Sequence, residues 1–236
     1  MKHVYVVRHD RRWGERQLIS PLGQRWHLRS FHDLWNKLFS ISYKPFRSRL
    51  NDIRESNFSQ IKGLDDRIDS WDIGKYQHEG VRFYATDDDD WFHPNIVEAL
   101  RPYPQKVIVW DYVEFSGGKL VRLKKGEPGR KFLFESNNYV MDAPCEEPQL
   151  MAHDVADRGI KDAFVIDEAL SIQNRTPASL TMYCFATHRA RANKTTIADE
   201  LVQEMRRCQE WNGEPLPGFE KCFERMVDLY REVKVL

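Results

Sequence analysis

Four consecutive carboxylates, Asp87-Asp88-Asp89-Asp90, are the residues whose types and spacing most directly indicate chemistry. Adjacent carboxylates repel one another unless a positive charge neutralises them, and the hard cations Mg²⁺, Mn²⁺ and Ca²⁺ prefer oxygen ligands. The tetrad directly follows the apolar run 81–86, which is typical of a buried strand. Ligands of open α/β sheets bind beyond the carboxyl ends of strands, so this position predicts a metal site. The alternative is a solvated loop that complements the start of the next helix.

Two basic segments follow other apolar runs, and both carry charge suited to a phosphate. The first comes after residues 4–7 and consists of Arg8, His9, Asp10 and Arg11. The second comes after residues 179–187 and includes His188, Arg189, Arg191 and Lys194. Guanidinium groups bind phosphate oxygens through charge-assisted hydrogen bonds. Ordinary charged loops, and a histidine with a structural role, are the alternatives.

The segment 86–95, which reads TDDDDWFHPN, resembles the DxD region of nucleotide-sugar glycosyltransferases with the GT-A fold. The bacterial rhamnosyltransferase-type members are the most similar. The resemblance implies that Asp87 and Asp89 hold Mn²⁺ or Mg²⁺, which bridges the donor diphosphate, and that Asp90 is an additional acid.

The same resemblance assigns expectations to the flanking segments. It places the donor nucleotide beside Arg8, His9, Asp10, Arg11, Asp87 and Asp88. It also implies that His188 completes the metal shell, while Arg189 and Arg191 face the diphosphate. It covers about residues 1–195 in outline.

The acidic general base of such enzymes has no clean counterpart in this sequence, because their usual Glu-Asp pair before a helix is missing. The candidates are Glu146, Glu147 and Asp154, which lie in or before the helix expected over 147–158. A solvated helix face is the alternative for each of them. Whether the reaction inverts or retains stereochemistry stays open.

Hydrophobic periodicity predicts the elements that must position these residues. Apolar runs favour strands over 4–7, 81–86, 106–113, 119–123, 131–135 and 179–187, with a Gly117-Gly118 hairpin turn. Helical spacing favours helices over 21–39, 94–100, 147–158, 196–211 and 217–232. Short helices and loops are expected over 40–80. This order predicts an α/β fold, GT-A-like and Rossmann-like, with a mixed, mostly parallel sheet flanked by helices. We expect a catalytic domain over 1–195 and a helical C-terminal tail over 196–236.

Composition bounds the function classes. The 236 residues contain 36 Lys+Arg and 36 Asp+Glu, and this balance argues against a general nucleic-acid partner. The four cysteines show no close ligand spacing, so reduced thiols are expected. The sequence contains no apolar run long enough for a transmembrane segment, and we expect a cytoplasmic protein. Oligomeric state stays open.

The sequence therefore predicts a metal-dependent glycosyltransferase that moves a sugar from a nucleoside-diphosphate donor to a hydroxyl acceptor, as in glycan or polysaccharide synthesis. The first alternative is a metal-dependent phosphohydrolase or nucleotidyltransferase that uses the same carboxylates. The second is a carbohydrate-binding module without catalysis.

Overall fold

The computed structural model describes residues 1–8, 18–19, 25–26, 28–87, 90–123, 138–145 and 163–236. Tertiary contacts divide the chain into two compact units. Unit 1 contains residues 1–9, 54–114 and 121–173, and unit 2 contains residues 10–53, 115–120 and 174–236. Unit 1 has an excess of acidic residues and unit 2 an excess of basic ones. The domain boundary expected at residue 195 stays a prediction.

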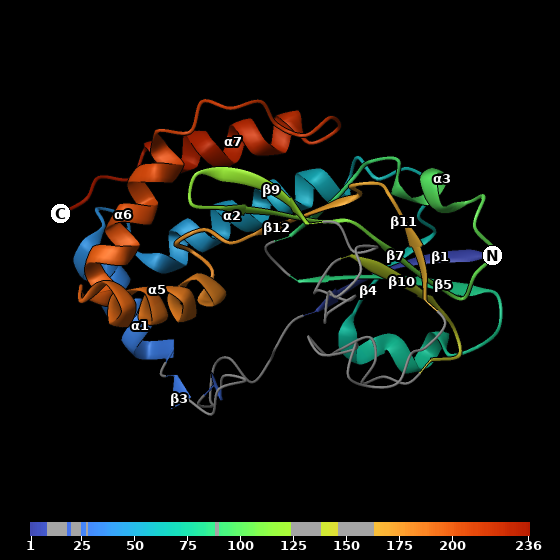
Figure 1. Cartoon of the computed structure of the whole chain (residues 1–236). Helices are drawn as coiled ribbons and strands as arrows, with labels where there is room; N and C mark the ends of the chain where they lie inside the picture. Colours follow the sequence, from blue (N-terminus) through green and yellow to red (C-terminus); the bar gives the residue numbers. More distant parts are fainter. Residues whose placement is uncertain (9–17, 20–24, 27, 88–89, 124–137, 146–162) are drawn as a thin grey trace. The chain divides into compact units, whose positions relative to one another are not determined.

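A six-stranded sheet forms the centre of unit 1, in the order β11-β7-β10-β5-β1-β4 (Figure 1). Its strands are β1 (Lys2–Arg8), β4 (Asp66–Asp69), β5 (Val81–Asp87), β7 (Val107–Trp110), β10 (Tyr139–Asp142) and β11 (Phe164–Ile166). Strand β1 pairs in parallel with β4 and β5, and β11 pairs in parallel with β7. Only β10 is reversed, because it is antiparallel to both β5 and β7. The predicted mixed α/β fold with a mostly parallel sheet is confirmed at this level.

Both faces of this sheet are buried, as expected for parallel strands covered on both sides. Side chains alternate between two core clusters. Val4 and Val6 join Phe83 on one face. Tyr5 and Val7 join Tyr84 on the other. The β-branched and aromatic composition of β1 and β5 therefore suits strands with no solvent-exposed face.

The remaining elements of unit 1 are short. They include η2 (Ser70–Tyr76), β6 (Trp91–Phe92) and α3 (Ile96–Leu100). The 40–80 segment was expected to contain only short helices and loops, and this expectation was wrong in two places. It contains the long helix α2 (Tyr43–Phe58), whose last turn belongs to unit 1, and strand β4. Strand β4 was missed because three of its four residues are charged.

A second sheet has the order β6-β12-β8-β9, where the new strands are β8 (Tyr112–Ser116), β9 (Lys119–Leu123) and β12 (Ser171–Asn174). The hairpin between β8 and β9 is confirmed, and its turn residues Gly117 and Gly118 have φ values of 63° and 65°. Such positive φ values at both central residues favour glycine. The single strand expected over 106–113 is divided into β7 and β8. A third, two-stranded sheet pairs β2 (Leu18–Ile19) with β3 (Arg25–Trp26).

Unit 2 is mainly helical and contains α1 (Leu28–Leu38), α5 (Leu180–Asn193), α6 (Ile197–Gln209) and α7 (Glu220–Arg231) (Figure 1). Helices α6 and α7 confirm the two predicted C-terminal helices. Helix α1 begins at Leu28 rather than near residue 21, because a strand occupies 25–26. No helix in the described part of the chain is long and apolar enough to cross a bilayer.

The strand predicted over 179–187 was wrong, since this segment forms the first half of α5. The Ser179 side chain accepts a hydrogen bond from the Met182 amide at 3.0 Å and caps the helix. Met182, Ala186 and Ala190 are buried at a spacing of four residues, so one helical face is apolar. The capping residue and this period outweigh the β-propensity of the segment. The strand predicted over 131–135 and the helix predicted over 147–158 lie outside the described residues.

Candidate functional site

The carboxyl ends of the parallel strands bring functional side chains to one edge of the six-stranded sheet. In the register of β1 and β5, Arg8 lies beside Asp87, the first residue of the tetrad. One residue earlier, Val7 pairs with Thr86 of β5 and with Asp69 of β4. The backbones of Arg8, Asp87 and Asp69 therefore lie at the strand ends where open α/β sheets bind their ligands.

The other half of the sheet adds two carboxylates at the same edge. Tyr84 of β5 and Ile108 of β7 both pair with Val140 of β10, so they lie at one level of the sheet. Three residues further along, Asp111 follows β7 at the level of Asp87. Ile166 pairs with Trp110, which places Asp167 next to Asp111. The register therefore aligns carboxylates from β5, β7 and β11 across the sheet.

Helix α2 supports the segment that carries the tetrad. The Asn57 side-chain oxygen accepts a hydrogen bond from the Phe92 amide at 3.2 Å, two residues after Asp90. Arg54, one turn earlier, is 3% exposed and donates from Nη2 to Glu55 at 2.5 Å. Asp90 is itself only 1% exposed. A buried carboxylate requires compensation by hydrogen bonds or positive charge, so this end of the tetrad belongs to the packed interior.

Arg54 also influences the neighbouring strand. Burial raises the pKa of Tyr5 to about 12, and the adjacent Arg54 guanidinium opposes that shift without reversing it. The Tyr5 hydroxyl therefore stays protonated in the physiological range. Arg67 of β4, which pairs with Tyr5, donates to the Glu55 carboxylate with a separation of 2.6 Å for Nη2. The two arginines share the Glu55 carboxylate, and of the two only Arg54 is fully buried.

A groove of about 410 Å³ lies beside β4 and η2. Its polar lining consists of Arg67, Asp69, Asp72, Lys75 and Tyr76. The groove thus adjoins the sheet edge and offers donors and acceptors of both charge signs. Such a lining suits a polar ligand better than an apolar one.

An ion network connects the ends of β7 and β11. The Arg122 Nε donates to Asp111 Oδ2 at 2.7 Å, and its Nη2 donates to Asp167 Oδ1 at 2.7 Å. The Asp111 side chain is 3% exposed, while that of Asp167 is 74% exposed. The Asp111 amide also donates to the Glu168 carbonyl at 2.9 Å. One buried and one exposed carboxylate are therefore held by the same guanidinium.

Most of the residues predicted for the site lie outside the described residues. This group consists of His9, Asp10, Arg11, Asp88, Asp89, Glu146, Glu147 and Asp154. Their predicted roles in nucleotide binding, metal binding and proton transfer stay predictions. Arg8 and Asp87 do lie at the expected strand ends.

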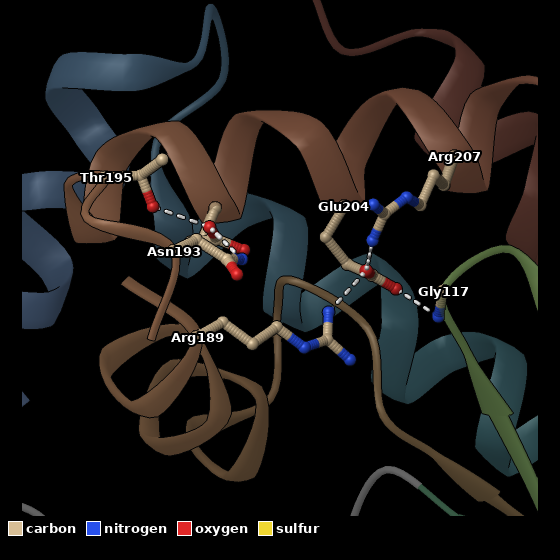
Figure 2. A network of polar contacts seen from close by, with 7 residues as sticks. Gly117, Arg189, Asn193, Thr195, Glu204 and Arg207 are labelled. Atoms are coloured by element: carbon tan, nitrogen blue, oxygen red, sulfur yellow. Dashed lines mark hydrogen bonds and ion pairs between the residues drawn. The ribbon is translucent and has the colours of Figure 1, made fainter. Parts of the chain in front are cut away.

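The three predicted site residues near the C-terminus belong to unit 2, and they lie on helix α5 rather than on the loop that was expected. His188 and Arg191 are exposed. Arg189 donates to the fully buried carboxylate of Glu204 at 3.1 Å, and Arg207 donates to the same oxygen at 3.3 Å. Figure 2 shows Glu204 between these guanidiniums and the hairpin amide of Gly117, which also donates to it. Arg189 therefore has a structural partner, and its role in diphosphate binding stays a prediction.

Within the residues that the structure describes, no three His, Cys, Asp or Glu side chains gather as a metal-binding group. Asp88 and Asp89 are not among those residues, so the predicted metal site is not tested. The four cysteines are free, and burial raises the pKa of Cys145 to about 11. No protein-family model and no curated protein matches the chain.

The sequence analysis missed four charged residues of the sheet edge: Asp69, Asp111, Arg122 and Asp167. A signal for two of them was present, because Asp111 follows the apolar run VIVW and Asp167 follows FVI. A carboxylate directly after an apolar run is the same pattern that marked the tetrad. Arg122 had no such signal, since only the pairing of β9 with β8 brings it to this edge.

Proposed function

We propose that the protein is a metal-dependent glycosyltransferase that moves a sugar from a nucleoside-diphosphate donor to a hydroxyl acceptor. The supporting observation is the position of the tetrad at the carboxyl end of β5, in register with Arg8 of β1. A diphosphate–metal complex needs oxygen ligands for the cation and a guanidinium for the remaining negative charge. Both are available at adjacent strand ends.

The carboxylates of the tetrad are oxygen ligands of the type that a hard cation prefers. Asp87 ends a strand whose backbone is fixed by pairing, and the buried Asp90 closes the tetrad at a segment bonded to Asn57. Asp87, Asp89 and Asp90 would hold Mn²⁺ or Mg²⁺. When bound, the metal would neutralise the charge that develops on the leaving diphosphate.

The chain's own residues would bind and orient the donor. Arg8 and Arg11 would contact phosphate, and His9 and Asp10 would lie near the base and ribose.

Isothermal titration calorimetry with UDP, GDP and TDP, each with and without MnCl₂, tests this proposal. The wild type should bind one of them in a metal-dependent way. Asp89→Ala should weaken binding by more than about 100-fold, since even outer-shell partners of a metal typically contribute 10–100-fold. Glu79→Gln is the matched control, because Glu79 is exposed and lies just before the opposite end of β5. If the wild type binds none of the three nucleotides, the proposal is wrong.

The two alternative functions predict different results. A phosphohydrolase would release phosphate from p-nitrophenyl phosphate in the presence of Mn²⁺, and the proposed transferase should not. A carbohydrate-binding module would bind glycans on an array without nucleotide and would leave sugar nucleotides unchanged.

A further inference from the structure

The ends of β7 and β11 carry a charged arrangement that the donor site does not use. Asp111 is buried, Asp167 is exposed, and Arg122 connects them through hydrogen bonds of 2.7 Å. Strand pairing fixes the backbones of Asp111 and Asp167 next to each other. This arrangement presents one solvent-accessible carboxylate in a fixed orientation.

The distance between Asp167 and the tetrad leaves room for an acceptor substrate beside the donor. Asp167 and Asp87 lie on strands separated by β10 and β7, and neighbouring strands are about 4.8 Å apart, so their backbones are roughly 14 Å apart. The two carboxylates therefore do not form one metal site. The space between them lies along the ligand-binding edge of the sheet. A donor sugar held at the tetrad through its diphosphate would extend into this space.

We infer that Asp167 is the general base that receives the acceptor proton, that Arg122 positions it, and that an acceptor hydroxyl binds at the ends of β7 and β11. This inference rests on the proposed transferase function and adds the acceptor side of the same site. Asp167 accepts from Arg122 through Oδ1 and its side chain is 74% exposed, so we assign Oδ2 to the acceptor hydroxyl. A hydroxyl that donates to Oδ2 can accept from the guanidinium beside it, as sugar hydroxyls do.

The step proposed for Asp167 is a direct displacement. The acceptor O–H bond breaks and its proton moves to Asp167 Oδ2. The acceptor oxygen forms a bond with the anomeric carbon of the donor sugar. The bond between that carbon and the diphosphate oxygen breaks, and its electron pair leaves with the diphosphate. Because attack and departure occur on opposite faces, the anomeric configuration is inverted.

Neighbouring carboxylates fit this role less well. Asp111 is 3% exposed, and its Oδ2 already accepts from Arg122, so it holds the guanidinium in place. Glu168 is also exposed, but it contributes its main-chain carbonyl to the Asp111 amide, whereas Arg122 pairs with the side chains of Asp111 and Asp167. Of these three described carboxylates, Asp167 is the one that combines an exposed side chain with a charged partner that fixes its direction.

A simple surface ion pair is the competing explanation. Exposed pairs contribute little to stability, typically less than about 1 kcal/mol. Arg122 differs from such a pair because its second partner is a buried carboxylate, so the guanidinium does not move freely with solvent. A general base and a simple surface ion pair therefore differ in their effect on turnover and not in their effect on stability.

The experiment uses the full chain with Mn²⁺ and the donors UDP-glucose, GDP-mannose and TDP-rhamnose, with water or added methyl glycosides as acceptors. Release of the nucleoside diphosphate reports turnover, and calorimetry reports nucleotide affinity. Asp167→Asn should lower turnover by about 10²–10⁴-fold, the usual contribution of a general base, with nucleotide affinity unchanged. Glu168→Gln is the matched control and should retain wild-type turnover. Arg122→Met should lower kcat rather than nucleotide affinity, and Arg122→Lys should restore part of the loss.

The outcomes separate the two proposals. Loss of turnover in Asp167→Asn with an inverted product supports the assignment. Turnover equal to that of the wild type, or a product that retains its configuration, overturns it. A wild type that binds a nucleoside diphosphate but turns over none of the donors also overturns the base assignment, while the nucleotide site stands. A wild type that binds no nucleotide refutes the proposed function, and the base assignment fails with it.

Discussion

The buried ion pair between Arg82 and Asp142 gives the sharpest test of how unit 1 is stabilised. Arg82 lies on β5 and is 2% exposed, and its Nε donates to Asp142 of β10 at 2.5 Å. Its Nη2 donates to the second carboxylate oxygen at 3.1 Å, so the pair is bidentate. The guanidinium also donates to the carbonyls of Tyr103 and Gln105, at 3.3 and 2.9 Å. Each of the three guanidinium nitrogens therefore donates to at least one acceptor.

Asp142→Asn should destabilise the protein by about 3 kcal/mol. Removing one partner of a buried pair typically costs 3–5 kcal/mol, because the remaining charge stays buried without compensation. We expect the low end of that range, since two carbonyl acceptors remain for Arg82. In a domain of 150–250 residues each kcal/mol shifts Tm by about 2–4 °C, so Tm should fall by roughly 6–12 °C. The double variant Arg82→Met/Asp142→Leu should recover most of this loss, because no uncompensated charge is left.

Urea denaturation followed by circular dichroism measures these changes. Asp72→Ala is the control, because it breaks the ion pair with Lys75, whose side chain is 73% exposed. That change should cost less than about 1 kcal/mol. The reasoning is refuted if Asp142→Asn costs no more than Asp72→Ala, or if the double variant is less stable than Asp142→Asn alone.

Three further predictions concern single positions. Burial lowers the pKa of His3 below its ordinary value of 6.5, so the unfolded chain binds the proton more readily; stability should fall as the pH drops below 6.5, and His3→Gln should flatten that slope in urea titrations. Gly118→Ala should destabilise by about 1–3 kcal/mol, because φ is positive and a Cβ would lie 2.5 Å from the Arg207 carbonyl oxygen, whereas Gly117→Ala meets no atom within 4 Å and should cost less. Ser179→Ala should cost about 1 kcal/mol through loss of the cap of α5, and an unchanged Tm would contradict this.

Hydrophobic patterns within single segments correctly predicted those strands and helices whose own residues favour that structure. The apolar runs of β1 and β5 and the amphipathic periods of α6 and α7 were sufficient. The strand prediction over 179–187 was wrong because the β-branched and aromatic residues of this segment have high strand propensity. The segment is helical because Ser179 caps it and because buried side chains recur every four residues along one face. Strand β4 is stabilised by pairing with β1 and not by its own composition, which is mostly charged. Neither result follows from propensity alone.

In the candidate site, too, some residues could be predicted from the local sequence and others could not. The tetrad was visible because its four carboxylates are adjacent in the sequence. Asp111, Arg122 and Asp167 are far apart along the chain, and only the pairing of their strands brings them together. No spacing rule within one sequence connects them. Carboxylates that directly follow buried strands are nevertheless worth comparing as a group, since parallel strands end at one edge.

The reversed strand β10 explains why this edge has two charged regions rather than one continuous acidic surface. Parallel strands β5 and β7 would otherwise end side by side, with their carboxylates about 5 Å apart. Because β10 lies between them, Asp87 and Asp111 are separated by two strand spacings, or about 10 Å. The amino end of β10 provides Asn138, which is fully buried and bonded in both directions to the Trp110 main chain, at 3.0 Å each. A neutral, fixed residue thus lies between the tetrad and the Asp111–Arg122–Asp167 network. Repulsion between the two acidic regions is reduced, and a ligand that contacts both can lie between them.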